Sequence, residues 1–200
     1  MFDVALRQLV DPALIRAAAW VSGARISANA LTITGAMLGL GAAFCITQSH
    51  FAAALAFIML NRIFDGLDGA IARINGPTEL GGYLDILCDY VFYLSVPVAF
   101  AWIDPANQMP ALILVASFTL TAVSFLAFAA IAARQPTDGG IHGPKAFIYS
   151  TGLMEGGETI AFFVLFCLFP AFFPTLAIVF ATLCLLTVMQ RMVLAAKSFR

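Results

Sequence analysis

Charged residues are scarce in this chain. Only 10% of its 200 residues are Asp, Glu, Lys or Arg, whereas 62% are apolar. A soluble domain of ordinary composition has about 25% charged residues, and one of this size buries only about 70% of its unfolded surface. So much apolar surface cannot be hidden in water. The composition excludes a soluble enzyme, a secreted disulfide scaffold and a disordered regulator, and it predicts an integral membrane protein.

Other sequence features are missing as well. The net charge of −1 leaves no basic excess for binding nucleic acid. No early apolar run suits a cleavable signal peptide, and no segment alternates like a membrane barrel strand. The four cysteines are far apart and lack the spacing of a metal or disulfide motif. They are Cys45, Cys88, Cys167 and Cys184. An all-α membrane protein is therefore the expectation.

Six largely apolar runs predict transmembrane helices, which need about 20 residues each. Five are clear, and a sixth, the second along the chain, begins apolar and becomes charged at its end. The runs cover residues 31–48, 51–74, 80–103, 111–134, 158–173 and 175–195. We expect a single membrane domain over residues 1–200, with a juxtamembrane segment at 1–30 and a six-helix bundle at 31–195.

The juxtamembrane segment predicts an amphipathic helix that lies on the membrane surface. Asp11 and Pro12 are typical of a helix start, an N-cap followed by proline at the first helical position. Leu14, Ala17 and Val21 follow at helical spacing and supply an apolar face for the lipid boundary.

Basic residues predict the orientation, because they accumulate on the cytosolic side of membrane proteins. With the N-terminus in the cytosol and six spans, all ten Lys and Arg residues fall on that side. The outer turns, predicted around residues 49–50, 104–110 and 174, then carry none. We therefore expect both termini, and any site at the inner ends of the helices, to face the cytosol.

Four aspartates lie where membrane helices rarely carry charge, at the inner ends of the second and third runs. Asp65 and Asp68 are three residues apart and Asp85 and Asp89 are four apart, so each pair shares a helix face. A short loop at 74–80 makes the two helices antiparallel neighbours, and the pairs can face each other. Such carboxylates need cations or must take up protons. Oxygen ligands without cysteine or histidine favour Mg²⁺ or Mn²⁺.

The sequence around these aspartates resembles the signature of the CDP-alcohol phosphotransferases. That signature reads D-x-x-D-G-x-x-A-R, then a spacer, then G-x-x-x-D-x-x-x-D. Its fixed positions fall on Asp65, Asp68, Gly69, Ala72, Arg73, Gly81, Asp85 and Asp89. The spacer is one residue shorter than usual, and we place the glycine role on Gly81 rather than Gly82. Residues 27–32 are similar to the T-P-N-x-L-T stretch that often opens the first span of the family.

The resemblance implies an enzyme of phospholipid biosynthesis in the bacterial cytoplasmic membrane, similar to the phosphatidylglycerophosphate synthases. It would transfer the phosphatidyl group of a CDP-linked lipid, with CDP-diacylglycerol as first candidate, to a small alcohol and release CMP. Glycerol 3-phosphate is one candidate acceptor. The resemblance implies two Mg²⁺ or Mn²⁺ ions and leaves a homodimer open.

The resemblance also implies a role for each matched residue. Asp65, Asp68 and Asp85 would bind metal, and Asp89 would bind the second metal and take the proton of the acceptor. Substrate binding would fall to Gly69 and Ala72 at the cytidine end, Arg73 at a phosphate, and Gly81, Asn29 and Thr32. Each of these has a structural alternative: close helix packing for the small residues, snorkelling for Arg73, and helix capping for Asn29 and Thr32.

The acceptor site is marked less clearly. Glu155 and Glu158 open the fifth run, where they either stabilise a helix N-terminus or contact the acceptor. Arg134, Lys145 and Arg191 are the candidates for a phosphate clamp.

Two other functions account for acids in membrane helices. Intramembrane prenyltransferases use aspartate-rich helices, Mg²⁺ and a pyrophosphate, but they need more spans and place their acidic motifs on distant helices. A cation transporter explains the buried acids but not Gly69, Ala72 and Arg73 at fixed offsets, and the chain shows no inverted repeat. Release of CMP from a CDP-lipid separates the three hypotheses.

Overall fold

The computed structural model describes residues 27–133 and 152–199, and these ranges are helical with no strand. The helices are α2 (Ala28–Thr47), α3 (Phe51–Asn75), α4 (Glu79–Ile103), α5 (Pro105–Ala132), α7 (Gly156–Leu168) and α8 (Phe173–Ser198), and a short 3₁₀ helix, η1 (Pro170–Phe172), precedes α8. Each α-helix corresponds to one predicted run, so the all-helical class is confirmed for these ranges. The predicted surface helix within residues 1–26 lies outside the described residues.

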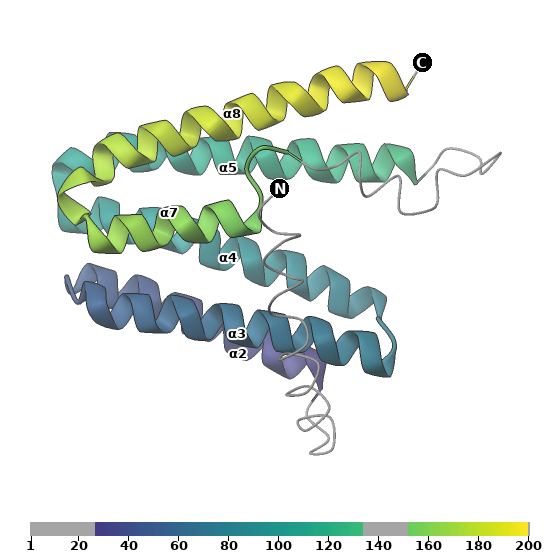
Figure 1. The fold of residues 1–200 in the computed structure, drawn as a ribbon, viewed down its shortest axis with the longest axis horizontal. Helices are drawn as coiled ribbons and strands as arrows, with labels where there is room; N and C mark the ends of the chain where they lie inside the picture. Colours follow the sequence, from purple (N-terminus) through teal and green to yellow (C-terminus); the bar gives the residue numbers. More distant parts are fainter. Residues whose placement is uncertain (1–26, 134–151, 200) are drawn as a thin grey trace.

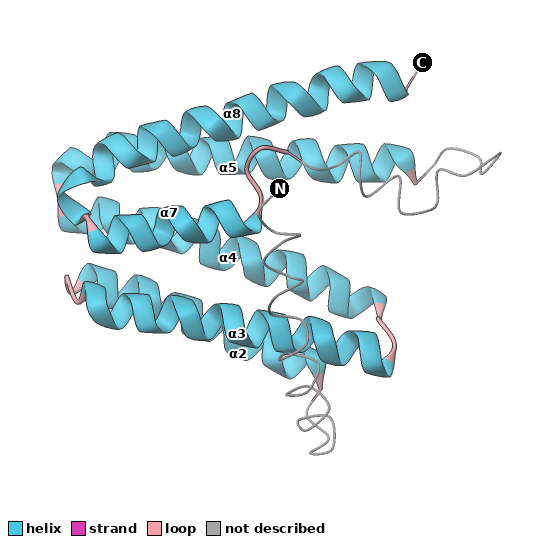
Figure 2. Cartoon of the chain, in the orientation of Figure 1, coloured by secondary structure: helices cyan, strands magenta, loops and turns pink. Residues whose placement is uncertain are grey.

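The helices run back and forth along one long axis (Figures 1 and 2). α3, α5 and α8 run toward the right-hand end of Figure 1, and α2, α4 and α7 run back toward the left. The right-hand end therefore collects the C-terminal half of α3 and the N-terminal half of α4, which carry the four aspartates.

Four helical segments among the described residues are long and apolar enough to cross a membrane. They are Ala28–Thr47, Glu79–Ile103, Pro105–Ala132 and Pro170–Ser198. α3 is long enough but carries two arginines and two aspartates, and α7 has only 13 residues. The membrane-protein class is thus supported, and the count of six spans stays a prediction.

The turn predicted at residues 104–110 is wrong, because α5 begins at Pro105 instead of residue 111. Asp104 is the N-cap, and its Oδ1 accepts a hydrogen bond of 2.8 Å from the backbone N–H of Ala106. Pro105 fits the first helical turn, where the missing N–H has no intrahelical partner. The Asn107 amide donates to the Phe100 carbonyl at 2.9 Å. These prolines and polar residues start a helix rather than interrupt one.

The connection between α3 and α4 sets the acidic pairs opposite each other. Gly76 ends α3 with a φ of 93°, a left-handed conformation that glycine adopts at little cost. Pro77 follows, and the Thr78 hydroxyl oxygen caps α4 by accepting from the Gly81 N–H at 3.0 Å. The chain therefore reverses within three residues, between Asn75 and Glu79.

Buried phenylalanine rings form much of the core. Phe100 of α4 stacks on Phe173, with ring centroids 4.5 Å apart, and meets Phe166 of α7 edge to face. Phe163 of α7 contacts Phe92 edge to face at 5.5 Å. Because these rings come from α4, α7 and α8, they fix α4 against the C-terminal helices.

α2 packs along both α3 and α4, which have few contacts with each other. It therefore forms the floor of the gap between them. Gly39 permits the close approach to α4, because a Cβ atom there would stand 2.7 Å from the Phe92 ring.

Replacing Gly39 by alanine should destabilise the fold, because the added methyl group meets a fully buried ring. We expect a loss of about 1–3 kcal/mol, as for other overpacked cores. Gly35, one helical turn earlier, is the matched control, since a Cβ there would lie an ordinary 3.5 Å from the Phe64 Cβ. Thermal unfolding of both variants in detergent should show a lower midpoint for Gly39→Ala alone. Equal midpoints would contradict the packing described for α2.

Candidate metal and substrate site

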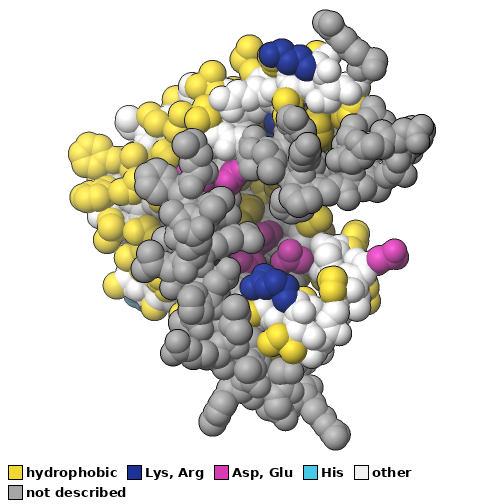
Figure 3. Space-filling model, turned by 45° about the vertical axis from the view of Figure 1, so that its right-hand side comes forward, with side chains coloured by type: hydrophobic (Ala, Val, Ile, Leu, Met, Phe, Trp, Pro, Cys, Tyr) yellow, Lys and Arg dark blue, Asp and Glu magenta, His cyan; other side chains and the backbone are white. Residues whose placement is uncertain are grey.

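Three of the four aspartates converge across the gap between α3 and α4. One carboxylate oxygen each from Asp65, Asp68 and Asp85 lies within 4.8 Å of the others. They line a small cavity of about 10 Å³, which is room for a single water-sized sphere. The rest of its lining comes from α2, α3 and α4: Thr32, Gly35, Ala36, Asn61, Cys88 and Asp89. In Figure 3 acidic side chains gather around a hollow of the surface, beside a basic side chain. Oxygen ligands at this spacing fit a hard divalent cation.

Asp68 is the most buried of the three and is oriented by α2. Its carboxylate oxygen Oδ2 accepts a hydrogen bond of 2.6 Å from the Thr32 hydroxyl. The same hydroxyl lies 3.1 Å from the Ala28 carbonyl, but its single proton goes to one acceptor at a time. The shorter distance is typical of a charge-assisted bond to a carboxylate. Thr32 therefore fixes a predicted metal ligand.

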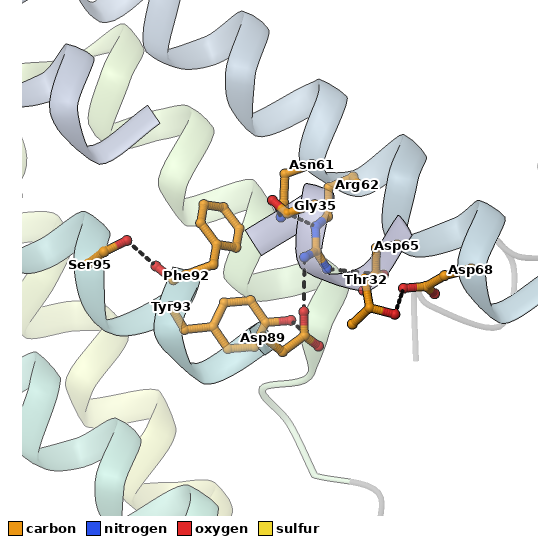
Figure 4. A network of polar contacts seen from close by, with 10 residues as sticks. All are labelled: Thr32, Gly35, Asn61, Arg62, Asp65, Asp68, Asp89, Phe92, Tyr93 and Ser95. Carbon is orange, nitrogen blue, oxygen red and sulfur yellow. Dashed lines mark hydrogen bonds and ion pairs between the residues drawn. The ribbon is translucent and has the colours of Figure 1, made fainter. Parts of the chain in front are cut away.

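Asp89 lies beside the group of three and is held by two protein side chains (Figure 4). Its Oδ1 accepts from Nη2 of Arg62 at 3.0 Å, and its Oδ2 accepts from the Tyr93 hydroxyl at 3.3 Å. Arg62 also donates from Nη1 to Asp65 Oδ2 at 3.3 Å. The guanidinium thus joins the two acidic pairs.

Sequence reasoning did not assign a site role to Arg62 or Tyr93. Arg62 precedes Asp65 by three residues, and Tyr93 follows Asp89 by four. Both spacings place side chains on one helix face. That signal was available, but the partner across the gap depends on how α3 and α4 are placed.

The predicted substrate-binding residues form two neighbouring groups. The Arg73 side chain folds back over Gly69, with Nη1 3.5 Å from where a Cβ on Gly69 would stand. A Cβ on Gly81 would lie 2.9 Å from Thr78 Oγ1 and 3.2 Å from Asn29 Oδ1, whereas one on Gly82 would contact nothing within 4 Å. The space that only glycine leaves is therefore at position 81.

The capping alternative for Asn29 and Thr32 is wrong. Ser27 is the N-cap of α2, and its hydroxyl oxygen accepts from the Ala30 N–H at 3.2 Å. Thr32 instead faces Asp68, and Asn29 lies next to Gly81. Ala72 is half-buried in α3.

A second cavity of about 130 Å³ lies between α4, α5, α7 and α8. Its polar lining consists of Tyr90, Tyr93, Thr121, Glu155, Thr159 and Arg191. Arg191 is buried and donates from Nη1 to the Thr121 carbonyl at 3.0 Å and to the Ser124 hydroxyl oxygen at 3.3 Å. Tyr93 lines this cavity while its hydroxyl donates to Asp89, which itself lines the first cavity.

The structural interpretation of Glu155 and Glu158 is confirmed. They form a capping box at the start of α7. The Glu155 carboxylate accepts from the backbone N–H of Glu158, and the Glu158 carboxylate accepts from the backbone N–H of Glu155. Glu155 also lines the second cavity. Arg134 and Lys145 lie outside the described residues.

Comparisons with known proteins agree with this fold. The family model of CDP-alcohol phosphatidyltransferase matches residues 25–197. This chain belongs to the CDP-alcohol phosphatidyltransferase family, which confirms the resemblance found in the sequence.

Individual relatives include the inner membrane protein YnjF of Escherichia coli K12. It is 40% identical over 192 residues, which cover 96% of this chain and 93% of YnjF. A phosphatidylcholine synthase of Pseudomonas aeruginosa is 32% identical over 79 residues, 37% of this chain and 33% of that protein.

Solved structures of the phosphatidylinositol phosphate synthase PgsA1 of Mycobacterium tuberculosis share the fold. The form with CDP-DAG bound has a TM-score of 0.72 at 19% identity and covers 90% of this chain and 91% of its own. The complex with manganese and citrate has a TM-score of 0.68 at 18% identity, with coverage of 92% and 88%.

Replacing Thr32 by valine should weaken the binding of a divalent ion by about tenfold or more, as loss of a group that orients a ligand does elsewhere. Valine keeps the shape but cannot donate to Asp68. Thr34→Val is the matched control, because the exposed Thr34 hydroxyl donates to the Ala30 carbonyl and lies outside the site lining. Titration with Mn²⁺ followed by electron paramagnetic resonance measures both affinities. Equal affinities for the two variants would contradict a metal-positioning role for Thr32.

Proposed function

We propose that this protein transfers the phosphatidyl group of a CDP-linked lipid to a small alcohol and releases CMP. The observation that carries the proposal is the convergence of Asp65, Asp68 and Asp85 within a chain of this family. The PgsA1 structure with bound CDP-DAG supports CDP-diacylglycerol as the donor. Family membership favours this function over a prenyltransferase or a cation transporter.

Asp65, Asp68 and Asp85 would hold a divalent ion, Mg²⁺ or Mn²⁺. The manganese complex of PgsA1 supports this assignment. Asp89 completes the ligand set for a second ion in our proposal. Bound there, the metal supplies positive charge for the diphosphate of the donor and for the oxygen that leaves with CMP.

The chain's own side chains bind and orient the donor. Arg73 lies over Gly69 and presents its guanidinium to a phosphate. Gly69 and Ala72 leave room on α3 for the cytidine end. On the facing side, Gly81 and Asn29 line the approach along the start of α4 and α2.

Asp89 is the proposed general base. The hydroxyl oxygen of the acceptor forms a bond to the phosphorus of the phosphatidyl group as the bond from that phosphorus to CMP breaks. Asp89 takes the hydroxyl proton. The products are the phosphatidyl alcohol and CMP. Arg62 and Tyr93 fix the Asp89 carboxylate for this proton transfer.

The acceptor enters the cavity between α4, α5, α7 and α8. That cavity adjoins Asp89 through Tyr93 and is lined by hydroxyl groups and by the buried Arg191. A guanidinium suits a phosphate or carboxylate group on a small alcohol, and glycerol 3-phosphate is the first acceptor to test.

The proposed location is the bacterial inner membrane, with six spans and the site and both termini on the cytosolic side. The relative YnjF is named an inner membrane protein, which supports this location. α3 crosses although it is charged, because its aspartates face α2 and α4 rather than lipid. α7, with 13 residues, is the shortest of the six proposed spans.

The purified protein should release CMP from CDP-diacylglycerol only when Mg²⁺ or Mn²⁺ and an acceptor are present. CMP is measured by chromatography, and the lipid product by mass spectrometry across a panel of acceptors that includes glycerol 3-phosphate. Chelation with EDTA should abolish release, and added Mg²⁺ should restore it. Full release in excess EDTA, or none with any acceptor, would overturn the proposed function.

Asp89→Asn should lower turnover by about 10²–10⁴-fold, because the amide cannot accept the acceptor's proton. Donor binding should be largely kept, since Asp65, Asp68 and Asp85 are unchanged. Asp104→Asn is the matched control, because Asp104 caps α5 at the opposite end of the bundle. Turnover within about tenfold of wild type in Asp89→Asn would show that another group accepts the proton.

A further inference from the structure

Arg62 is a mostly buried cation that contacts both acidic pairs. Its side chain is 19% exposed, and all three of its guanidinium nitrogens are engaged (Figure 4). Nε donates to Asn61 Oδ1 at 2.8 Å, Nη1 to Asp65 at 3.3 Å and Nη2 to Asp89 at 3.0 Å. This differs from an exposed surface ion pair, which has little fixed geometry.

The position of the Arg62 guanidinium is set by three helices. Asn61 is 3% exposed, and its amide nitrogen donates to the Gly35 carbonyl of α2 at 2.7 Å. That bond turns the Asn61 oxygen toward Arg62. From α4, the rings of Phe92 and Tyr93 lie 5.3 and 5.8 Å from the guanidinium carbon, within cation–π range. The charge is therefore held in place before any ligand arrives.

Arg62 occupies the carboxylates that a second metal ion would need. Both oxygens of Asp89 accept hydrogen bonds from protein, one from Arg62 and one from Tyr93. Asp65 is paired with Arg62 through Oδ2. The cavity that these carboxylates help to line has a volume of about 10 Å³, room for one water-sized sphere. A second ion would have to displace the guanidinium or share its ligands, and like charges at this range repel strongly.

We propose that Arg62 is a positioning residue that makes binding of the second metal ion depend on the donor. In the donor-free protein, Asp65, Asp68 and Asp85 take one divalent ion, and Arg62 serves as the counter-ion of Asp89. The donor's diphosphate supplies two negative charges and further oxygen ligands, which offset the repulsion and admit the second ion. The donor step rests on the proposed function; the donor-free step does not.

Removal of the Arg62 charge should have opposite effects on metal binding and on turnover. Without donor, Arg62→Gln should bind the second Mn²⁺ at least about tenfold more tightly than wild type, because a repelling charge is gone and two carboxylates are released. Its turnover should fall, because Asp89 loses its orientation. Arg62→Lys keeps the positive charge, so the second ion should still bind weakly. Lys197→Gln, an exposed charge at the end of α8, is the control for net charge.

Mn²⁺ titration followed by electron paramagnetic resonance gives the number of ions and their affinities in each variant. Without CDP-diacylglycerol, the wild-type protein should bind one ion tightly. With CDP-diacylglycerol present and no acceptor, it should bind two. A merely structural Arg62 predicts that a folded Arg62→Gln binds Mn²⁺ no tighter than wild type, and that result would overturn the proposal. If Arg62→Gln does not fold, the wild-type titration decides, since two equally tight ions without donor would overturn it.

Failure of the proposed function looks different. The wild-type protein could fail to consume CDP-diacylglycerol while the Arg62→Gln variant still binds Mn²⁺ more tightly. That result would support Arg62 as the internal counter-ion of Asp89 and would contradict only the donor step. The two results therefore separate the two proposals.

Discussion

Repulsion among four carboxylates held between two helices is the constraint on which this site depends. Three of the four carboxylates accept hydrogen bonds from neighbouring side chains. The Thr32 hydroxyl donates to Asp68, and the Arg62 guanidinium bridges Asp65 and Asp89. Asp65, Asp68 and Asp85 still point oxygens toward one another within 4.8 Å. Such an arrangement costs free energy without positive charge between them, and a cation bound there would offset that cost.

The packing of α2 supports this charge arrangement directly. Gly35 presents its carbonyl to Asn61, which in turn holds Arg62. Gly39, one turn further, lets α4 approach so closely that the Phe92 ring lies over the same guanidinium. Larger residues on this face of α2 would push α3 and α4 away from α2. Helix packing and site electrostatics therefore depend on the same few contacts.

The sequence was sufficient to predict the helices and the acidic pairs, because both follow from local patterns. Apolar runs define the helices, and spacings of three and four residues put Asp65 with Asp68 and Asp85 with Asp89 on shared faces. The start of α5 was misjudged, since Asp104 and Pro105 fit a helix start as well as a turn. Arg62 was not assigned a role in the site. Its contact with Asp89 spans 27 positions in the sequence and depends on how α2 spaces the two helices.

Tyr93 connects the acidic gap to the second cavity and explains why the four aspartates are not equivalent. Its hydroxyl donates to Asp89, while the same side chain lines the space between α4, α5, α7 and α8. Asp89 is thus the carboxylate that lies beside the group of three, and Tyr93 links it to the cavity that carries Arg191. In our proposal Asp65, Asp68 and Asp85 share a cation, whereas Asp89 takes the proton of a hydroxyl group that comes from the second cavity.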